Sequence, residues 1–172
     1  MPGKIVFLDR DGVLNEEIGD YVYRLEDFKI CEGVPQALRL LKYAGFTLVV
    51  VTNQGGIGRG IYTRQHMQAC HDYLHENTGS LIDAFYYSPY HRSVTKSLLS
   101  KPNSVMLEKG LHCFKADPAE SWLVGDAERD LEAAEHVGVR GILVPTVKEQ
   151  TSARAVFVAK SLFGAAQFIL KA

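Results

Sequence analysis

Residues 4–15 read KIVFLDRDGVLN, an apolar run that changes within one residue into closely spaced acids. The first five residues are apolar apart from the leading lysine, which is typical of a strand buried on both faces. A second such run, FTLVVV at 46–51, follows a segment with helical spacing at 35–45. In that segment Pro35 suits a first helical turn and Gly45 suits a C-terminal stop. The two runs therefore predict a strand–helix–strand unit with parallel strands.

The same alternation of short apolar runs and helical segments continues to the end of the chain. Further strands are predicted at 84–88, 121–125 and 141–145, with a short one within 155–161, and helices are predicted at 63–77, 103–115, 130–138 and before Leu170. Strands of this kind, each followed by a helix, are typical of a parallel sheet covered on both faces. We expect an α/β fold with a doubly wound parallel sheet, formed as a single domain over residues 1–172.

Composition excludes several functional classes. Apolar residues make up 47% of the 172 residues, a normal globular share, and the formal net charge is -1. Because there is no dense lysine and arginine run, we expect neither nucleic acid nor a membrane as a partner. No apolar run approaches the roughly 18 residues of a membrane span, and the start lacks the features of a signal peptide.

Three scattered cysteines, Cys31, Cys70 and Cys113, fit a reducing cytoplasm. We expect a monomer or a weak homo-oligomer.

Polar residues collect just after the predicted strands, where ligands bind in open α/β sheets. The first strand is followed by Asp9 and Asp11, the second by Thr52, Asn53 and Gln54, the third by a loop that reaches Lys101, and the fourth by Asp126 and Asp130. Taken singly, each has an ordinary explanation, since acid pairs are common on surfaces and Thr-Asn is a common turn or helix cap. A packed core gives no reason for their joint placement at one edge.

This combination of residue types suits phosphate ester chemistry. Several acids at one edge repel one another unless a cation lies among them, and a hard dication with oxygen ligands describes Mg²⁺. One carboxylate then attacks phosphorus, while Asp11 protonates the leaving oxygen and later deprotonates the attacking water. Thr52 and Asn53 hold phosphate oxygens, and Lys101 neutralises charge on the transferring group. We therefore expect a small-molecule phosphate ester as the substrate and Mg²⁺ as the cofactor.

At these residues the chain resembles the haloacid dehalogenase (HAD) superfamily. The four motifs of that superfamily appear in order as FLDRDGVLN (7–15), VVVTNQ (49–54), SKP (100–102) and LVGDAERD (123–130). The resemblance implies that Asp9 is the nucleophile and Asp11 the general acid and base, and that Thr52, Asn53 and Lys101 bind the transferring phosphate. It also implies a magnesium site on the Asp9 carboxylate, the Asp11 backbone carbonyl and Asp126, with Asp130 as a nearby acid or water-mediated ligand.

A closer resemblance, over nearly the whole chain, is to the branch of heptose 1,7-bisphosphate 7-phosphatases and histidinol phosphatases. It rests on GDYV (19–22), EGVPQALRLLKYAGF (32–46), VVVTNQGGIGRG (50–60) and KPNSVML (101–107). The spacing leaves no room for a large cap domain. The resemblance implies a sugar phosphate substrate, with a heptose bisphosphate as the best guess and histidinol phosphate as the alternative. It makes Asp20, Tyr21, Gln54 and Arg59 the candidates for specificity.

Two positions depart from the pattern of this branch. Relatives commonly carry a structural zinc in the loop after the third strand, held by cysteine and histidine, but this loop keeps only His91 as a potential ligand. A tetrahedral zinc site needs four ligands, so no zinc is expected. In relatives an arginine precedes the conserved lysine and helps to fix substrate, and here that position is Ser100.

Three other functions compete with the phosphatase interpretation. A phosphomutase of this superfamily usually has a cap that keeps water from the phospho-enzyme. A receiver-type signalling domain carries its phosphorylated aspartate after the third strand, where this chain has Tyr86, Tyr87 and Ser88. A catalytically degenerate phosphate-binding module remains open because of Ser100, although the four motifs are intact.

Overall fold

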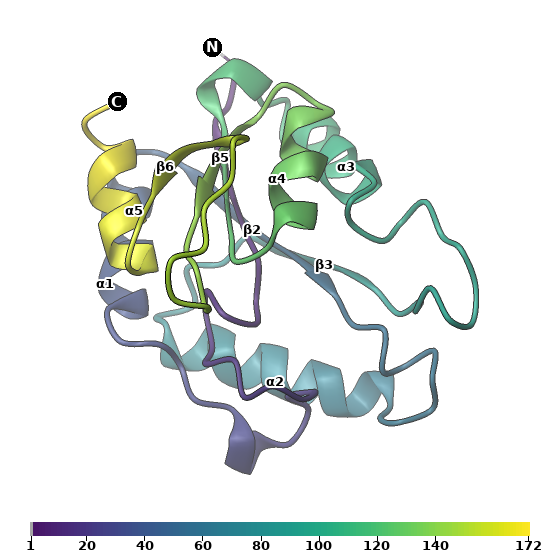
Figure 1. Cartoon of the computed structure of the whole chain (residues 1–172). Coiled ribbons are helices and arrows are strands. Elements are labelled where there is room, and N and C mark those ends of the chain that lie inside the picture. The colour runs from purple at the N-terminus through teal and green to yellow at the C-terminus, as the bar shows by residue number, and fades with distance from the viewer. Residues whose placement is uncertain (1) are drawn as a thin grey trace.

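Six parallel strands form one twisted sheet in the computed structural model, which describes residues 2–172. The strand order across the sheet is β3-β2-β1-β4-β5-β6. The strands are β1 (Ile5–Leu8), β2 (Thr47–Asn53), β3 (Ala84–Ser88), β4 (Trp122–Gly125), β5 (Arg140–Leu143) and β6 (Ala155–Val158). The first strand of the chain is therefore central, with β2 on one side and β4 on the other (Figure 1).

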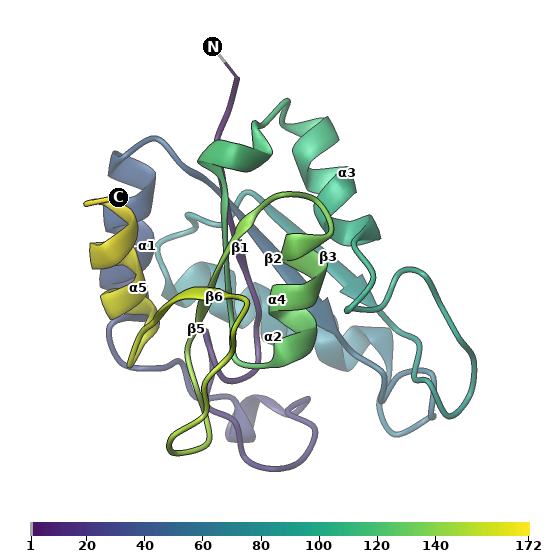
Figure 2. The same ribbon diagram turned by 45° about the horizontal axis from the view of Figure 1, so that its top comes forward.

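Helices cover both faces of this sheet, as Figure 2 shows with α1 and α5 on one side and α3 and α4 on the other. They are α1 (Val34–Tyr43), α2 (Arg64–Asn77), α3 (Val105–Cys113), α4 (Glu128–Glu135) and α5 (Leu162–Ile169), with short 3₁₀ turns at Leu25–Asp27 and Pro118–Glu120. The predicted doubly wound α/β fold is confirmed, and no large cap is present in the part of the chain that the structure describes.

Alternate side chains of β1 explain why the sheet needs both layers. Val6 and Leu8 belong to the core that packs under α1, α2 and α5, whereas Ile5 and Phe7 belong to the core under α3 and α4. All four are fully buried. Because successive side chains of a strand point to opposite faces, an apolar run without alternation is stable only between two layers.

Predicted element ends differ from the observed ones by a few residues, and the two edge strands differ in burial. The helix expected at 103–115 is shorter at both ends, the one expected at 130–138 begins two residues earlier, and the strand within 155–161 ends at Val158. The strands predicted to be buried, β1 and β2, are buried, whereas β3 is mostly half-buried and β6 is largely exposed. Each has a neighbouring strand on one side only, so less of its surface is covered.

Local signals at helix ends do match the prediction. Thr63 caps α2, with its Oγ1 accepting a hydrogen bond from the backbone N–H of His66. Gly45, just after α1, has a φ of +84°, a conformation that glycine adopts at low cost. These caps fix where the helices turn back toward the sheet.

Candidate active site

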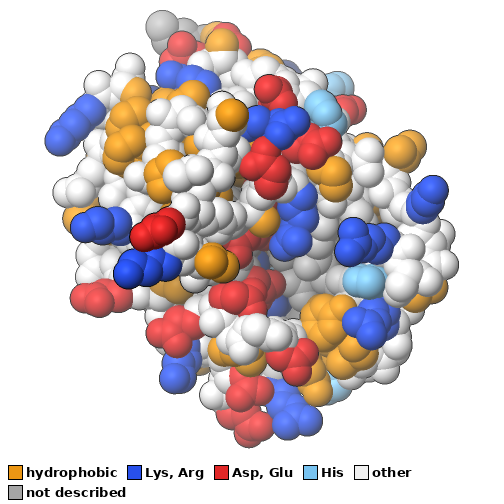
Figure 3. Space-filling view, in the orientation of Figure 1, with side chains coloured by type: hydrophobic (Ala, Val, Ile, Leu, Met, Phe, Trp, Pro, Cys, Tyr) orange, Lys and Arg blue, Asp and Glu red, His pale blue; other side chains and the backbone are white. Residues whose placement is uncertain are grey.

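The carboxyl ends of the central strands bring the predicted site residues to one edge. Leu8, the last residue of β1, pairs with Val124 near the end of β4 and with Val50 of β2, which continues to Asn53. Asp9 follows β1 directly and Asp126 follows β4. Figure 3 shows acidic and basic side chains around a hollow in this face of the molecule.

A buried lysine links two of the acids. Lys101 Nζ lies 2.9 Å from Asp9 Oδ1 and 2.6 Å from Asp130 Oδ1, and it donates a 2.8 Å hydrogen bond to the carbonyl oxygen of Val51. The Lys101 side chain is only 1% exposed. The two carboxylates raise the pKa of Lys101 against the opposing effect of burial, so the ammonium stays charged. The lysine that was predicted to bind phosphate is thus held rigidly at the side chain of the predicted nucleophile.

Asn53, at the end of β2, holds the backbone of Lys101 rather than pointing freely into the site. Its Nδ2 donates to the Lys101 carbonyl oxygen, and its Oδ1 accepts from the Lys101 backbone N–H, both at 3.0 Å. This pair of hydrogen bonds spans 48 residues of sequence. Its predicted role as a direct phosphate ligand stays a prediction.

Three acids form the only cluster of potential metal ligands with mutually close atoms within residues 2–172. Asp9, Asp126 and Asp130 each offer an oxygen within 4.8 Å of the others, and all three side chains are buried. Burial, together with Asp9 and Asp130, raises the pKa of Asp126 to about 8, and burial and Asp130 raise that of Asp9 to about 6 although Lys101 opposes the shift. Asp126 Oδ1 is buried without a hydrogen-bond partner in the described chain. Three carboxylates facing one ammonium leave an excess negative charge, and oxygen donors of this kind fit Mg²⁺.

Gly12 lets the loop after β1 approach Asp126. Its φ is +84°, and a Cβ placed there would lie 2.5 Å from Asp126 Oδ2. A side chain at this position would therefore displace the carboxylate of Asp126. The DRDG sequence places the backbone of this loop against the acid after β4.

Asp11 is fixed by three neighbours, two on its own loop and one just after β2. Its Oδ1 accepts from Arg10 Nη2 at 2.9 Å and from Asn15 Nδ2 at 3.0 Å, while its Oδ2 accepts from Gln54 Nε2 at 3.1 Å. Gln54 also donates to Thr52 Oγ1 at 2.9 Å. The buried Thr52 is thus connected to Asp11 through one amide group.

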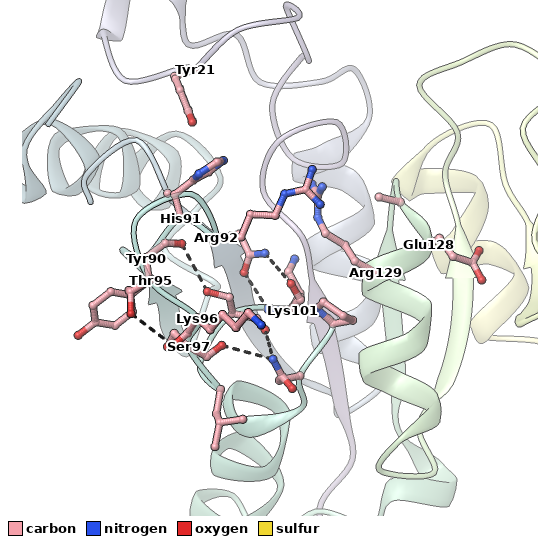
Figure 4. A pocket seen from close by; sticks show the side chains of 17 residues that line it. Tyr21, Tyr90, His91, Arg92, Thr95, Lys96, Ser97, Lys101, Glu128 and Arg129 are labelled. Atoms are coloured by element: carbon pink, nitrogen blue, oxygen red, sulfur yellow. Dashed lines mark hydrogen bonds between the residues drawn. The ribbon is translucent and has the colours of Figure 1, made fainter. Parts of the chain in front are cut away.

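Two cavities open onto this edge of the sheet. The larger, of about 900 Å³, is lined by residues of the 90–103 loop together with Asn53, Lys101 and Arg129 (Figure 4). The smaller, of about 320 Å³, is lined among others by Asp11, Gln54 and Arg129. Because Asn53 and Arg129 line both, the two cavities adjoin one another, and Lys101, which contacts the buried Asp9, lines the larger one.

The four predicted specificity residues do not all face these cavities. Asp20 and Gln54 line the smaller cavity, and Tyr21 lines both. Arg59 lines neither, and its Nη1 instead donates a 3.1 Å hydrogen bond to the hydroxyl oxygen of Tyr21. The contact of Arg59 is therefore with a cavity-lining side chain and not with the cavity itself.

Sequence reasoning missed three side chains that shape the site. Arg10 is fully buried, and besides Asp11 it binds the carbonyl oxygen of Val22 at 2.6 Å. Tyr62 donates a 2.5 Å hydrogen bond to Gln54 Oε1, which orients that amide. Arg129 lines both cavities. The basic residue between two acids in DRD was the only available signal, because Tyr62 and Arg129 act through contacts that the local sequence does not encode.

The loop after β3 is closed by hydroxyl and amide groups. Ser88 Oγ and Ser100 Oγ lie 2.6 Å apart at the two ends of the loop. Asn103 Nδ2 donates to the carbonyl oxygens of Ser97 and Ser100 at 3.3 and 3.1 Å. His91 Nδ1 lies 2.7 Å from Ser93 Oγ. These contacts hold the loop together without a metal ligand set, and the expected absence of zinc stays a prediction.

Known proteins similar to this chain share both its sequence and its fold. A family model described as HAD-hydrolase-like matches residues 98–163. A D-glycero-beta-D-manno-heptose-1,7-bisphosphate 7-phosphatase from Haemophilus ducreyi is 40% identical over 88% of this chain and 88% of its own length. The chain belongs to the HAD superfamily of hydrolases.

Other members of the superfamily resemble this chain over most of its length. A D-glycero-D-manno-heptose-1,7-bisphosphate 7-phosphatase from Thermosynechococcus vestitus is 38% identical over 85% of this chain and 81% of its own. The crystal structure of a D,D-heptose 1,7-bisphosphate phosphatase from B. bronchiseptica, complexed with magnesium and phosphate, has a TM-score of 0.88 and 28% identity and covers 98% of both chains. In this HAD hydrolase, no helix among residues 2–172 has the length and apolarity to cross a membrane.

Proposed function

We propose that this HAD hydrolase removes the 7-phosphate of D-glycero-D-manno-heptose 1,7-bisphosphate through a phospho-aspartate on Asp9. The observation that carries the chemistry is the buried contact of Lys101 with Asp9 and Asp130 beside the ligand-like carboxylate of Asp126. The substrate is supported by relatives at 40% and 38% identity that are named as phosphatases of this bisphosphate.

Asp9 acts as the nucleophile in this proposal. Lys101 Nζ and the backbone N–H of Arg10 both bind Asp9 Oδ1, at 2.9 Å each, so Oδ2 is the oxygen that we assign to the attack. The attack forms an Asp9–phosphorus bond and breaks the bond between phosphorus and the sugar oxygen. Lys101 holds the carboxylate in one orientation and places a positive charge beside the group that is transferred.

Asp11 carries the protons in both half-reactions. It donates a proton to the departing sugar oxygen, and it then takes one from the water that cleaves the phospho-aspartate. The contacts with Asn15 and Gln54 keep its carboxyl group at the boundary of the smaller cavity. The product phosphate leaves, and both aspartates return to their starting states.

The three buried acids and the Asp11 backbone carbonyl form the proposed magnesium site. When bound, Mg²⁺ supplies the positive charge that lets the acids stay ionised beside an anionic substrate. Asp126 contributes the carboxylate without a partner, and Asp130 keeps Lys101 in place through its contact of 2.6 Å. The magnesium and phosphate of the B. bronchiseptica enzyme support this assignment.

Phosphate release in the presence of Mg²⁺ tests the proposal, with a panel of heptose 1,7-bisphosphate, histidinol phosphate, common sugar phosphates and an aryl phosphate. We expect the heptose ester to be hydrolysed best. Asp9→Asn should reduce release to background, since an amide does not attack phosphorus, and Asp11→Asn should slow it by roughly 10²–10⁴-fold. Retained activity in Asp9→Asn would contradict the covalent mechanism. A preference for histidinol phosphate would show that the heptose bisphosphate is not the substrate.

A further inference from the structure

The larger cavity carries an excess of positive charge. Arg92 and Lys96, from the loop after β3, and Arg129, from the first turn of α4, all line it. Figure 4 shows Arg92 and Arg129 reaching toward one another from different elements. An anion bound beside these groups would reduce the repulsion between their like charges.

These basic side chains form no close ion pair in the described part of the chain. None of the ion pairs within 4.0 Å includes Arg92, Lys96 or Arg129. Glu128, which also lines the cavity, is paired with Arg154 and points away from Arg129 in Figure 4. None of the three is held in an ion pair, although the nearby acids of the site raise the pKa of Arg129 against the opposing effect of burial. Their N–H groups can therefore donate to an anion that enters the cavity.

We propose that Arg92 and Arg129 bind the second phosphate of a sugar bisphosphate, the one that is not hydrolysed. This inference rests on the proposed function, because it places the reacting phosphate at Asp9. One guanidinium group can donate two parallel hydrogen bonds to a phosphate, so two such groups that line one cavity can hold the same phosphate from two directions; we call this pair, Arg92 and Arg129, the clamp. The cavity volume of about 900 Å³ accommodates a phosphorylated sugar. The clamp lies beside Lys101 and supplies positive charge where Ser100 replaces an arginine of related enzymes.

The selectivity between bisphosphate and monophosphate is the property that this clamp should determine. We would measure kcat/KM for heptose 1,7-bisphosphate and for heptose 7-phosphate, which lacks only the second phosphate. The wild-type protein should prefer the bisphosphate by roughly 10-fold or more. Arg129→Met and Arg92→Met should each reduce this preference by roughly 10-fold, mainly by weakening turnover of the bisphosphate. Arg129→Lys should retain part of it, because the charge remains without the two-point contact.

Arg39→Met is the matched control, because Arg39 is an exposed arginine on α1 that lines neither cavity. It should leave the preference unchanged, and thermal unfolding of each variant shows that the fold is retained. If Arg92→Met and Arg129→Met lower kcat/KM equally for both substrates, these arginines do not bind the second phosphate. The proposed function would remain intact in that case. If the wild-type protein hydrolyses another phosphate ester but neither heptose ester, both the proposed substrate and the proposed role of Arg92 and Arg129 are wrong.

Binding of heptose 1-phosphate, the expected product, gives a second measurement that needs no turnover. It carries only the phosphate that the clamp should hold, so it should inhibit the wild-type protein competitively. The inhibition constant should rise roughly 10-fold in Arg129→Met and stay the same in Arg39→Met. An unchanged inhibition constant in Arg129→Met would contradict the binding of the second phosphate by Arg129.

Discussion

The acids at the end of β1 and β4 illustrate how single residues set the charge of the site. Asp9, Asp126 and Asp130 face one ammonium, that of Lys101. If all three acids are ionised, the four groups together carry a net charge of about two negative units, which one divalent cation compensates. Without a cation the acids favour protonation, which is why the pKa of Asp126 rises to about 8 and that of Asp9 to about 6.

This charge arrangement predicts an unusual pH dependence of stability in the absence of metal. The usual pKa of an aspartate is near 3.8, so between about pH 4 and pH 8 the folded protein holds more protons on Asp126 than the unfolded chain does. The free energy of unfolding should therefore fall as the pH rises through this window, and level off above it. In EDTA, Asp126→Asn should remove most of the decrease between pH 6 and 8 and stabilise the protein at pH 8 by more than about 1 kcal/mol.

Urea unfolding of both proteins in EDTA at several pH values measures this effect. A smaller decrease between about pH 4 and pH 6 should persist in the variant, because Asp9, whose pKa is raised to about 6, still contributes its own share there. Asp117→Asn, at an exposed turn away from the site, is a suitable control. If the free energy of unfolding depends on pH in the same way in Asp126→Asn and in the wild-type protein, the acids do not destabilise each other.

At the scale of elements, the site depends on how the end of β2 meets the loop before α3. The two hydrogen bonds between Asn53 and the backbone of Lys101 connect these segments. Asn53→Ala removes both and should lower kcat about 10-fold, because Lys101 is then less well positioned against Asp9. KM should change less than kcat if Asn53 acts through Lys101, whereas a direct ligand of the substrate phosphate would raise KM.

Asn77→Ala is a matched control for this prediction. Its Nδ2 donates a 2.8 Å hydrogen bond to the carbonyl oxygen of Tyr73 at the exposed end of α2. We expect wild-type kinetics for this variant. A normal kcat in Asn53→Ala would show that the side-chain contacts of Lys101 with Asp9, Asp130 and the Val51 carbonyl oxygen suffice to keep its position.

The sequence predicts elements better than it predicts the contacts between them. Thr63 and Gly45 mark their helix ends through local chemistry that the residues carry themselves. The contact between Asn53 and Lys101 joins positions 48 residues apart, and the approach of Arg92 and Arg129 depends on the path of the loop after β3. The residues after the strands could be predicted because parallel strands end at one edge, but which side chains hold one another depends on the folded arrangement.

At the scale of the whole molecule, one sheet contains strands from both ends of the chain. The central strand β1 lies between β2 and β4, and β6, near the C-terminus, lies beside β5 at an edge. This supports the prediction that the chain folds as one domain, although residues 98–163 alone match the family model. The site draws on β1, β2 and β4 and on the loop before α3, so it forms only when these segments come together.

Magnesium should therefore stabilise the entire fold and not one segment. A ligand that binds only the folded protein adds about 2.7 kcal/mol at 100 times its Kd, which for a chain of 172 residues corresponds to a rise in Tm of about 5–10 °C. Differential scanning calorimetry at pH 7.5 should show one transition that moves upward with Mg²⁺. In Asp126→Asn the rise in Tm caused by Mg²⁺ should be less than about half of the wild-type rise, because the Asp126 carboxylate, which has no hydrogen-bond partner on Oδ1, is lost. Two transitions, of which only one responds to Mg²⁺, would show that the chain contains separately folding units and that the acids belong to one of them.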